Sequence, residues 1–393
     1  MASVIIRPMS AVTLDLDRQQ KAKEYARLRR RLMLFDLALG AVYLLLWLFS
    51  GWSQALKSYL LARTNNEWLL VAGFGLVFGV GYLLITLPLS YFEGFILPHR
   101  YGLSNQTFTG WVSDQVKGLL VGGLLGGLML ELIYAVLRLY PDTWWLWAAG
   151  LLLVFDVILA NLGPVLIFPL FYKFTPLGEE YAELADRLVH LAERAGTRVR
   201  GVFKFDMSRR TKAANAALTG LGNTRRIILG DTLLNEFTPD EIETVLAHEL
   251  GHHVHKDIPV GMLVSTLTTL VGLYLASLVL DWGVSYFGFS APGDIAGLPL
   301  FILVMALYGL VTMPLSNGYS RWRERRADEY ALRMTGKGEA YASALTRLAN
   351  QNLAEVDPEP WVEFLLYSHP ALGKRIERAV NFPTLLVDEG ATV

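Results

Sequence analysis

Six runs of apolar residues, each long enough to cross a lipid bilayer, divide the chain. They cover residues 32–52, 68–92, 119–139, 144–172, 258–280 and 298–315. About 20 apolar residues in a helix span the hydrocarbon core of a membrane. The pattern therefore predicts a multi-pass α-helical membrane protein with about six spans, joined to polar segments at residues 173–257 and 318–393.

The hydrophobic period changes within residues 173–257. Residues 179–195 place Leu184, Leu188 and Leu191 at helical spacing. Three short apolar runs are typical of strands, namely residues 199–206, 213–219 and 226–229. Thr238-Pro239-Asp240-Glu241 is a capping box with proline at the first helical position, which starts another helix. The segment is therefore predicted to be a small α+β unit.

The basic residues indicate how the spans are oriented. Lysines and arginines are dense before the first span and in the two polar segments, whereas the loop at residues 281–297 has none. Cytoplasmic loops carry the excess of Lys and Arg in membrane proteins. We therefore expect both termini and the long polar segment to face the cytoplasm.

Composition narrows the functional classes. The chain is 53% hydrophobic and 18% charged, against about 25% charged in soluble domains. A net charge of −1 gives no reason to expect nucleic-acid binding. There are no cysteines, so disulfides, thiolate metal sites and cysteine nucleophiles are excluded.

Two features within the spans allow more than one interpretation. Gly118, Gly122 and Gly126 recur at four-residue intervals, a spacing that favours close helix packing. Acidic residues also occur within spans, at Asp36, Glu131 and Asp156. Charges there are costly, so these side chains line an aqueous cavity or form hydrogen bonds between helices.

The stretch LAHELGHHVHKD, just before the fifth span, carries the candidate chemistry. His248 and His252 are one helical turn apart and about 40° around the axis, so both imidazoles can reach one zinc ion. Glu249 lies beside them, placed to take a proton from water at the metal. This H-E-x-x-H pattern predicts a zinc hydrolase.

The remaining ligand must come from elsewhere. His255 lies about 10 Å along the helix axis from His248, which is too far for one ion, and His253 and His255 are interpreted as bystanders near the membrane surface. Beyond the sixth span, Glu324 and Asp328 share one helical face. A solvated charged helix is the alternative explanation, but H-E-x-x-H upstream favours a metal ligand followed by a residue that orients a histidine.

Several motifs occur together in one order, and in this the chain resembles the type I CAAX prenyl proteases, integral-membrane zinc endopeptidases of gluzincin type. The resemblance covers about residues 87–382. Its motifs are LPLSYFEGFILPHRYGLSNQTFTGWVSDQVKG, LIFPLFYKFTPL, SRRTKAANAALTGLGNTRRIILGDTLL, H-E-x-x-H, N-x-x-S-R-x-x-E-x-x-x-D from residue 317, and SHPALGKRI.

The resemblance implies roles for the matched residues. It implies metal ligation by His248, His252 and Glu324, with Glu249 as general base. Asp328 and Asn317 would contact and orient the metal ligands without binding the metal. Asn215 and Ala216 would lie on an edge strand that pairs with extended substrate. His369 and Arg375 would approach the site, polarising the scissile carbonyl or holding a substrate carboxylate. The implied fold is a ring of membrane helices around a water-filled chamber, closed by the protease domain.

The chain also departs from the family pattern. Ala217 stands where relatives commonly have an aromatic residue, and Tyr172 where they often have Asn or Asp. Eukaryotic members have seven spans, one more than predicted here. We expect four parts: an N-terminal membrane domain (1–172), a protease subdomain with the edge strand and H-E-x-x-H helix (173–257), a membrane hairpin (258–317), and a C-terminal part that completes the site (318–393).

These observations predict an integral-membrane zinc metalloendopeptidase with one Zn²⁺ per chain. Its partners would be the bilayer and a peptide or protein substrate, with or without a prenyl group, cleaved near its C-terminus. The short loops and short C-terminal part favour a prokaryotic cell membrane. The alternatives are a quality-control zinc protease of membrane proteins and, from another class, a non-catalytic scaffold or channel.

Overall fold

Six helices in the structure are long and apolar enough to cross a membrane. The computed structural model describes residues 13–220 and 225–382, and the six helices are Leu16–Phe49, Glu67–Arg100, Phe108–Leu139, Trp144–Phe171, Asp257–Phe287 and Ile295–Thr335. The prediction of six spans is confirmed. The helices are longer than the apolar runs, because their polar continuations leave the lipid without breaking the backbone ladder.

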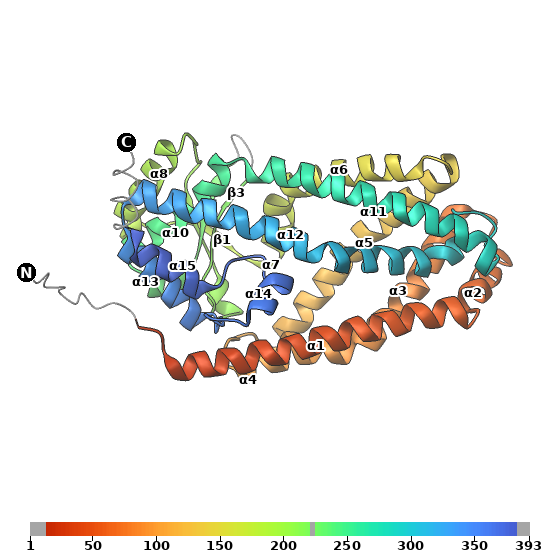
Figure 1. Cartoon of the computed structure of the whole chain (residues 1–393), viewed down its shortest axis with the longest axis horizontal. Coiled ribbons are helices and arrows are strands. Elements are labelled where there is room, and N and C mark those ends of the chain that lie inside the picture. The colour runs from red at the N-terminus through yellow and green to blue at the C-terminus, as the bar shows by residue number, and fades with distance from the viewer. Residues whose placement is uncertain (1–12, 221–224, 383–393) are drawn as a thin grey trace, which may run out of the picture.

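The six helices form a closed ring. Each of α1, α3, α5, α6, α11 and α12 contacts the next in that order, and α12 contacts α1. The principal segments are α1 (Leu16–Phe49), α2 (Trp52–Leu61), α3 (Glu67–Tyr91), α5 (Phe108–Leu139), α6 (Trp144–Leu162), α7 (Phe168–Phe171), α11 (Asp257–Phe287) and α12 (Leu298–Thr335). The sheet and the remaining helices gather at one end of this long bundle (Figure 1).

Packing within the ring is uneven along its length. A core of buried residues, including Trp47, Phe74, Tyr134, Trp144 and Leu280, fills the end farther from the sheet. Between that core and the sheet, no residue is buried at 23–42 of α1, 112–128 of α5, 150–162 of α6, 258–271 of α11 or 301–320 of α12. Side chains on every face of these helices are accessible there, as expected of a ring around an open interior.

The glycine stripe lies at this accessible level, and the prediction that it packs a neighbouring helix is wrong. A Cβ atom added at Gly118, Gly122 or Gly126 would meet nothing within 4 Å. Small residues therefore face open space here. Asp156 on α6 is also exposed at this level, and because charge facing lipid is costly, this exposure favours an aqueous interior over an interhelix hydrogen bond.

Four strands form the sheet, in the order β1-β2-β4-β3. They are β1 (Phe174–Pro176), β2 (Val202–Phe205), β3 (Ala216–Thr219) and β4 (Arg226–Gly230). β3 pairs with β4 alone, antiparallel, so its other side is a free sheet edge within the described residues. The sequence pattern predicted the last three strands and missed β1, which is only three residues long and ends in a proline.

Helices complete the domain. They are α8 (Ala182–Arg194), α9 (Asp231–Glu236), α10 (Pro239–Val254), α13 (Gly338–Gln351), α14 (Pro360–Leu366) and α15 (Leu372–Val380). Of these, α8, α9 and α10 pack against the sheet, and α13, α14 and α15 pack against α10, α12 and one another. α12 runs without interruption through residue 317. The division expected at that position therefore falls inside one continuous helix and is not a break in the backbone.

Candidate metal centre

The helix α10 begins and ends at positions that determine where its histidines lie. The Thr238 side chain accepts from the backbone N–H of Glu241, whose carboxylate accepts from the backbone of Thr238, so the predicted capping box is present. Beyond the last turn, Lys256 adopts a φ of 56°. This left-handed conformation costs about 1 kcal/mol or more for a residue other than glycine, and it redirects the chain so that α11 starts at Asp257.

A close crossing of α10 and α12 brings the two halves of the candidate site together. A Cβ atom at Gly251 would lie 3.0 Å from Cα and 3.2 Å from the carbonyl oxygen of Ala327. Only glycine allows the backbones to approach this far. His248, three residues before Gly251, and His252, the next residue, consequently face Glu324 of α12.

Three potential ligand groups converge at this crossing. The Nε2 atoms of His248 and His252 are 3.3 Å apart, and each lies 3.3 Å from a carboxylate oxygen of Glu324. Ligand atoms about 2.0–2.1 Å from a tetrahedral ion are about 3.3–3.4 Å from one another. One carboxylate oxygen of Glu324, Oε2, is buried and accepts no hydrogen bond. The donor set and its spacing therefore fit a divalent cation.

The other nitrogen of His248 is held by a buried polar cluster. Its Nδ1 lies 2.9 Å from Oδ1 of Asp328 and 3.2 Å from the hydroxyl of Tyr341. Tyr341 donates to Asp328 at 2.6 Å, and the Arg375 guanidinium donates two bonds to the same carboxylate, at 2.6 and 2.9 Å. A proton on Nδ1 leaves Nε2 as the lone-pair donor toward the crossing.

His252 is oriented by a residue whose role the sequence pattern did not reveal. Its Nδ1 lies 2.7 Å from Oδ2 of Asp257, which is buried and also lies 3.3 Å from Nε of Arg323. Asp257 occurs five residues after His252, and the left-handed turn at Lys256 folds it back. That conformation has no signature in the sequence, since lysine rarely adopts it.

Replacing Asp257 by alanine is expected to weaken metal binding about 10- to 100-fold, because His252 loses the acceptor that fixes its ring and tautomer. Competition with a fluorescent chelator would measure the change. Asp186→Ala, on the exposed face of α8, is the matched control. Unchanged affinity in Asp257→Ala would refute this role.

The remaining predicted residues lie at different distances from the crossing. His369 is 59% exposed, and its Nε2 lies 3.3 Å from Oε1 of Glu324. Asn317 instead donates to the carbonyl oxygen of Leu365, at 2.6 Å, and so anchors α14. The structure thus gives Asn317 a partner other than the ligands it was predicted to support.

The two bystander histidines lie outside the ligand cluster, which contains His248, His252 and Glu324. Nε2 of His253 lies 3.3 Å from the guanidinium of Arg225, and the ring of His255 lies 6.0 Å from that of Tyr330. Helix geometry explains why they lie away from the ligand groups. Neither side chain projects from α10 at the level along its axis where His248 and His252 face Glu324.

The electrostatics of the site favour positive charge at the crossing. Burial alone would lower the pKa of His248, but the carboxylates of Asp328 and Glu324 outweigh it and raise that pKa to about 9. Burial raises the pKa of the Glu249 carboxyl group, and the neighbouring histidines oppose that rise. A cation bound here would replace the protons and favour the carboxylate form of Glu249.

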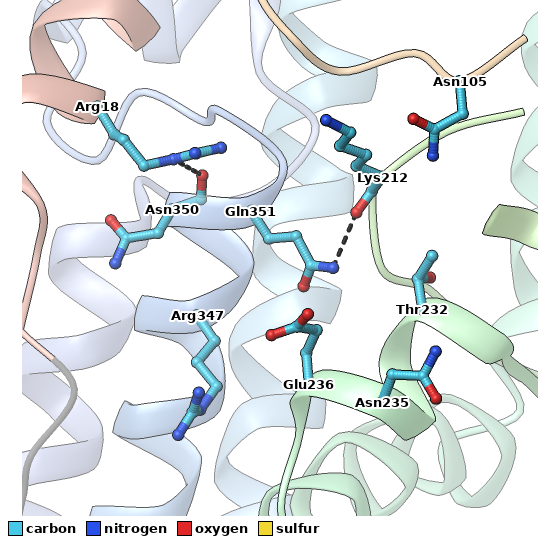
Figure 2. Close-up of a pocket in the computed structure, with 9 residues that line it drawn as sticks. All are labelled: Arg18, Asn105, Lys212, Thr232, Asn235, Glu236, Arg347, Asn350 and Gln351. Carbon is cyan, nitrogen blue, oxygen red and sulfur yellow. Dashed lines mark hydrogen bonds between the residues drawn. The ribbon is translucent and has the colours of Figure 1, made fainter.

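A separate polar pocket of 420 Å³ lies between α1, α9 and α13 (Figure 2). Gln351 donates to the carbonyl oxygen of Lys212 across it, and Arg18 donates to that of Asn350. None of the ligand residues lines this pocket. Asn215 and Ala216 lie elsewhere, at the start of the edge strand β3, where Asn215 is exposed.

Comparisons with known proteins agree with this geometry. The model of peptidase family M48 matches residues 179–382, and the model described as "CAAX prenyl protease N-terminal, five membrane helices" matches residues 8–173. Residues 13–173 of this chain contain four helices long enough to span a membrane, so this region departs from that description by one.

Curated relatives and a crystal structure cover most of the chain. An uncharacterized metalloprotease of Bacillus subtilis, YhfN, is 32% identical over 91% of this chain and 84% of its own length. CAAX prenyl protease 1 of Saccharomyces cerevisiae is 33% identical over 75% and 68%. The crystal structure of S. mikatae Ste24p superposes with a TM-score of 0.83 at 26% identity, covering 95% of this chain and 91% of that one. The chain therefore belongs to peptidase family M48 and is a membrane metalloendopeptidase of the CAAX prenyl protease type.

Proposed function

We propose that the chain binds one zinc ion through His248, His252 and Glu324, and that Glu249 serves as the general base of peptide hydrolysis. The observation that carries this proposal is the convergence of two imidazole Nε2 atoms 3.3 Å apart, each 3.3 Å from one of the two carboxylate oxygens of Glu324. One of those oxygens, Oε2, is buried and accepts no hydrogen bond. Two imidazoles and one carboxylate are a common donor set for catalytic zinc.

The residues of the chain divide the chemistry among them. When bound, zinc supplies a Lewis acid that lowers the pKa of water towards about 7. Glu249 takes the proton from the attacking water and passes it to the leaving amine. His369, exposed and beside Glu324, donates to the carbonyl oxygen as negative charge develops there.

The edge strand β3 binds the substrate in this proposal. An extended peptide would add to the open side of β3 through main-chain hydrogen bonds, beginning near Asn215 and Ala216. Ala217, at the position where relatives commonly have an aromatic residue, leaves this part of the cleft wider for a substrate side chain.

The substrate would be a peptide segment close to the membrane, cleaved near its C-terminus. If it is of the CAAX type, it also carries a prenyl group. Family membership and the intact donor set give no support to a non-catalytic scaffold or channel. A quality-control protease would instead be expected to cleave a peptide equally well with and without the prenyl group. The distribution of basic residues supports an active site and both termini on the cytoplasmic side. The short loops favour a prokaryotic cell membrane.

Cleavage of matched peptides with and without a farnesylated cysteine tests the substrate. We expect the prenylated peptide to have the higher kcat/KM, because the lipid adds apolar burial. Elemental analysis should find one zinc per chain. A chelator should abolish cleavage, and zinc should restore it. Equal kcat/KM for the two peptides would exclude the CAAX-type substrate, and full activity in metal-free protein would exclude the mechanism.

A further inference from the structure

A basic pocket of 550 Å³ lies where the membrane end of α7 meets the sheet. Its cations come from four separate segments of the chain, and none of the described residues that line it is acidic: they include Lys117, Lys173, Arg209 and Arg226. Cations brought together from distant segments repel one another, so their arrangement indicates an anionic occupant.

Neutral backbone oxygens hold three of these cations in place. Lys117 donates to the carbonyl oxygen of Leu170 at 2.9 Å, and Arg209 to that of Phe171 at 3.4 Å. Arg226 donates to the carbonyl oxygen of Pro164 at 3.0 Å. The chain forms a π-helix at Gly163–Ile167, in which each carbonyl oxygen accepts from the N–H five residues later. For Pro164 that residue is Pro169, which has no N–H. The carbonyl oxygen of Pro164 is therefore available to Arg226.

The nearest carboxylates offset only part of the positive charge of the pocket. Asp114 lies 3.8 Å from Lys117, but Arg210 already engages it with two hydrogen bonds, at 2.6 and 2.8 Å. Asp206 lies 3.8 Å from Arg209 and offsets the charge of that one cation. The cations are therefore positioned by the fold and keep an excess of positive charge.

The surface beside the pocket is apolar and exposed. Val165, Leu166, Phe168 and Leu170 are 42–59% exposed and belong to the span that ends at Phe171. Tyr172 and Phe174 follow at the level where aromatic residues meet lipid headgroups. The polar pocket in Figure 2 differs, because it contains Glu236 and is lined by polar residues throughout.

We propose that the basic pocket binds the phosphate headgroup of an anionic phospholipid, whose acyl chains lie along the exposed apolar face of residues 165–170. An anion joined to hydrocarbon matches the two halves of this surface, and basic pockets at the ends of membrane helices are suited to such headgroups. The site is separate from the metal centre, and binding there does not depend on the proposed chemistry.

Titration of the full-length protein in neutral detergent with dioctanoyl phosphatidylglycerol tests the proposal, with dioctanoyl phosphatidylcholine and inorganic phosphate as parallel probes. Lys173→Gln and Arg209→Gln change exposed side chains. We expect each to weaken phosphatidylglycerol binding about fivefold, and the pair about 10- to 30-fold. The matched control, Arg18→Gln with Lys212→Gln, removes the same charge from the pocket in Figure 2 and should bind as the wild type does.

Each result decides the question. Selective binding of phosphatidylglycerol that weakens only in the Lys173 and Arg209 variants supports the site. Equal binding of phosphatidylcholine would show that charge is not recognised. Equally tight binding of inorganic phosphate would assign the pocket to a free anion, and unchanged phosphatidylglycerol binding in the double variant would place the lipid elsewhere. Any of these last three outcomes overturns the proposal.

Discussion

Replacing Glu249 by glutamine is expected to lower kcat/KM for peptide cleavage by about 10³-fold, within the range that a positioned general base contributes. Glutamine keeps the size of the side chain and its place on α10, but it cannot accept a proton from water. Because Glu249 is not among the clustered ligand groups, metal content should remain near one ion per chain.

The design of this experiment separates catalysis from folding. Glu193→Gln makes the same chemical change at an exposed position of α8, and it should leave cleavage and metal content unchanged. Zinc content and thermal midpoint measured on the same preparations show whether the Glu249 variant is intact. Normal cleavage by the Glu249 variant would show that another group takes the proton and would remove the proposed mechanism.

Features that depend on local chemistry could be predicted from the sequence. His248, Glu249 and His252 lie within one helical turn, and the start of that helix is marked by a capping box, so helical periodicity alone places them together. Glu324 and Asp328 are likewise one turn apart. The crossing that joins these two groups depends on Gly251, which occupies the second variable position of the H-E-x-x-H pattern.

Features that depend on tertiary contacts could not be predicted from the sequence. Asp257 reaches His252 only through the left-handed turn at Lys256. Tyr341 reaches Asp328 of α12 only because α13 packs beside both α10 and α12. The prediction that the glycine stripe packs against a helix was wrong for the same reason. Residue spacing shows that one helix face has no side chains, but not which part of the structure that face meets.

Arg375 shows how the structure changes an expectation inherited from the resemblance. It was expected to approach the substrate, yet its side chain is about 10% exposed and its guanidinium is engaged with Asp328 and the hydroxyl of Tyr341. These contacts support a positioning role, exerted on His248 through Asp328. Binding of a substrate carboxylate by Arg375 remains a prediction, and the two roles differ in what a substitution should do.

Replacing Arg375 by methionine is expected to destabilise the folded protein by about 3–5 kcal/mol, because it leaves the Asp328 carboxylate buried without its charged partner. Adding Asp328→Asn should recover much of that loss, as the uncompensated charge is removed, although His248 would then lose its anionic acceptor. The thermal midpoints and zinc affinities of the single and double variants measure both effects. Arg375→Lys, which keeps the charge but not the paired bonds, should fall between wild type and methionine.

A substrate-binding role for Arg375 makes the opposite prediction. The methionine variant would then fold and bind zinc as the wild type does, and the loss would appear as a raised KM for peptides that end in a free carboxylate. Amidated peptides would be cleaved equally by both proteins. Three guanidinium N–H groups of Arg375, on Nε and Nη2, already bond to Asp328 and Tyr341, and its side chain is about 10% exposed. Because the contacts made in the folded protein are therefore those with buried groups, we expect the loss to appear in stability and zinc affinity, not in KM.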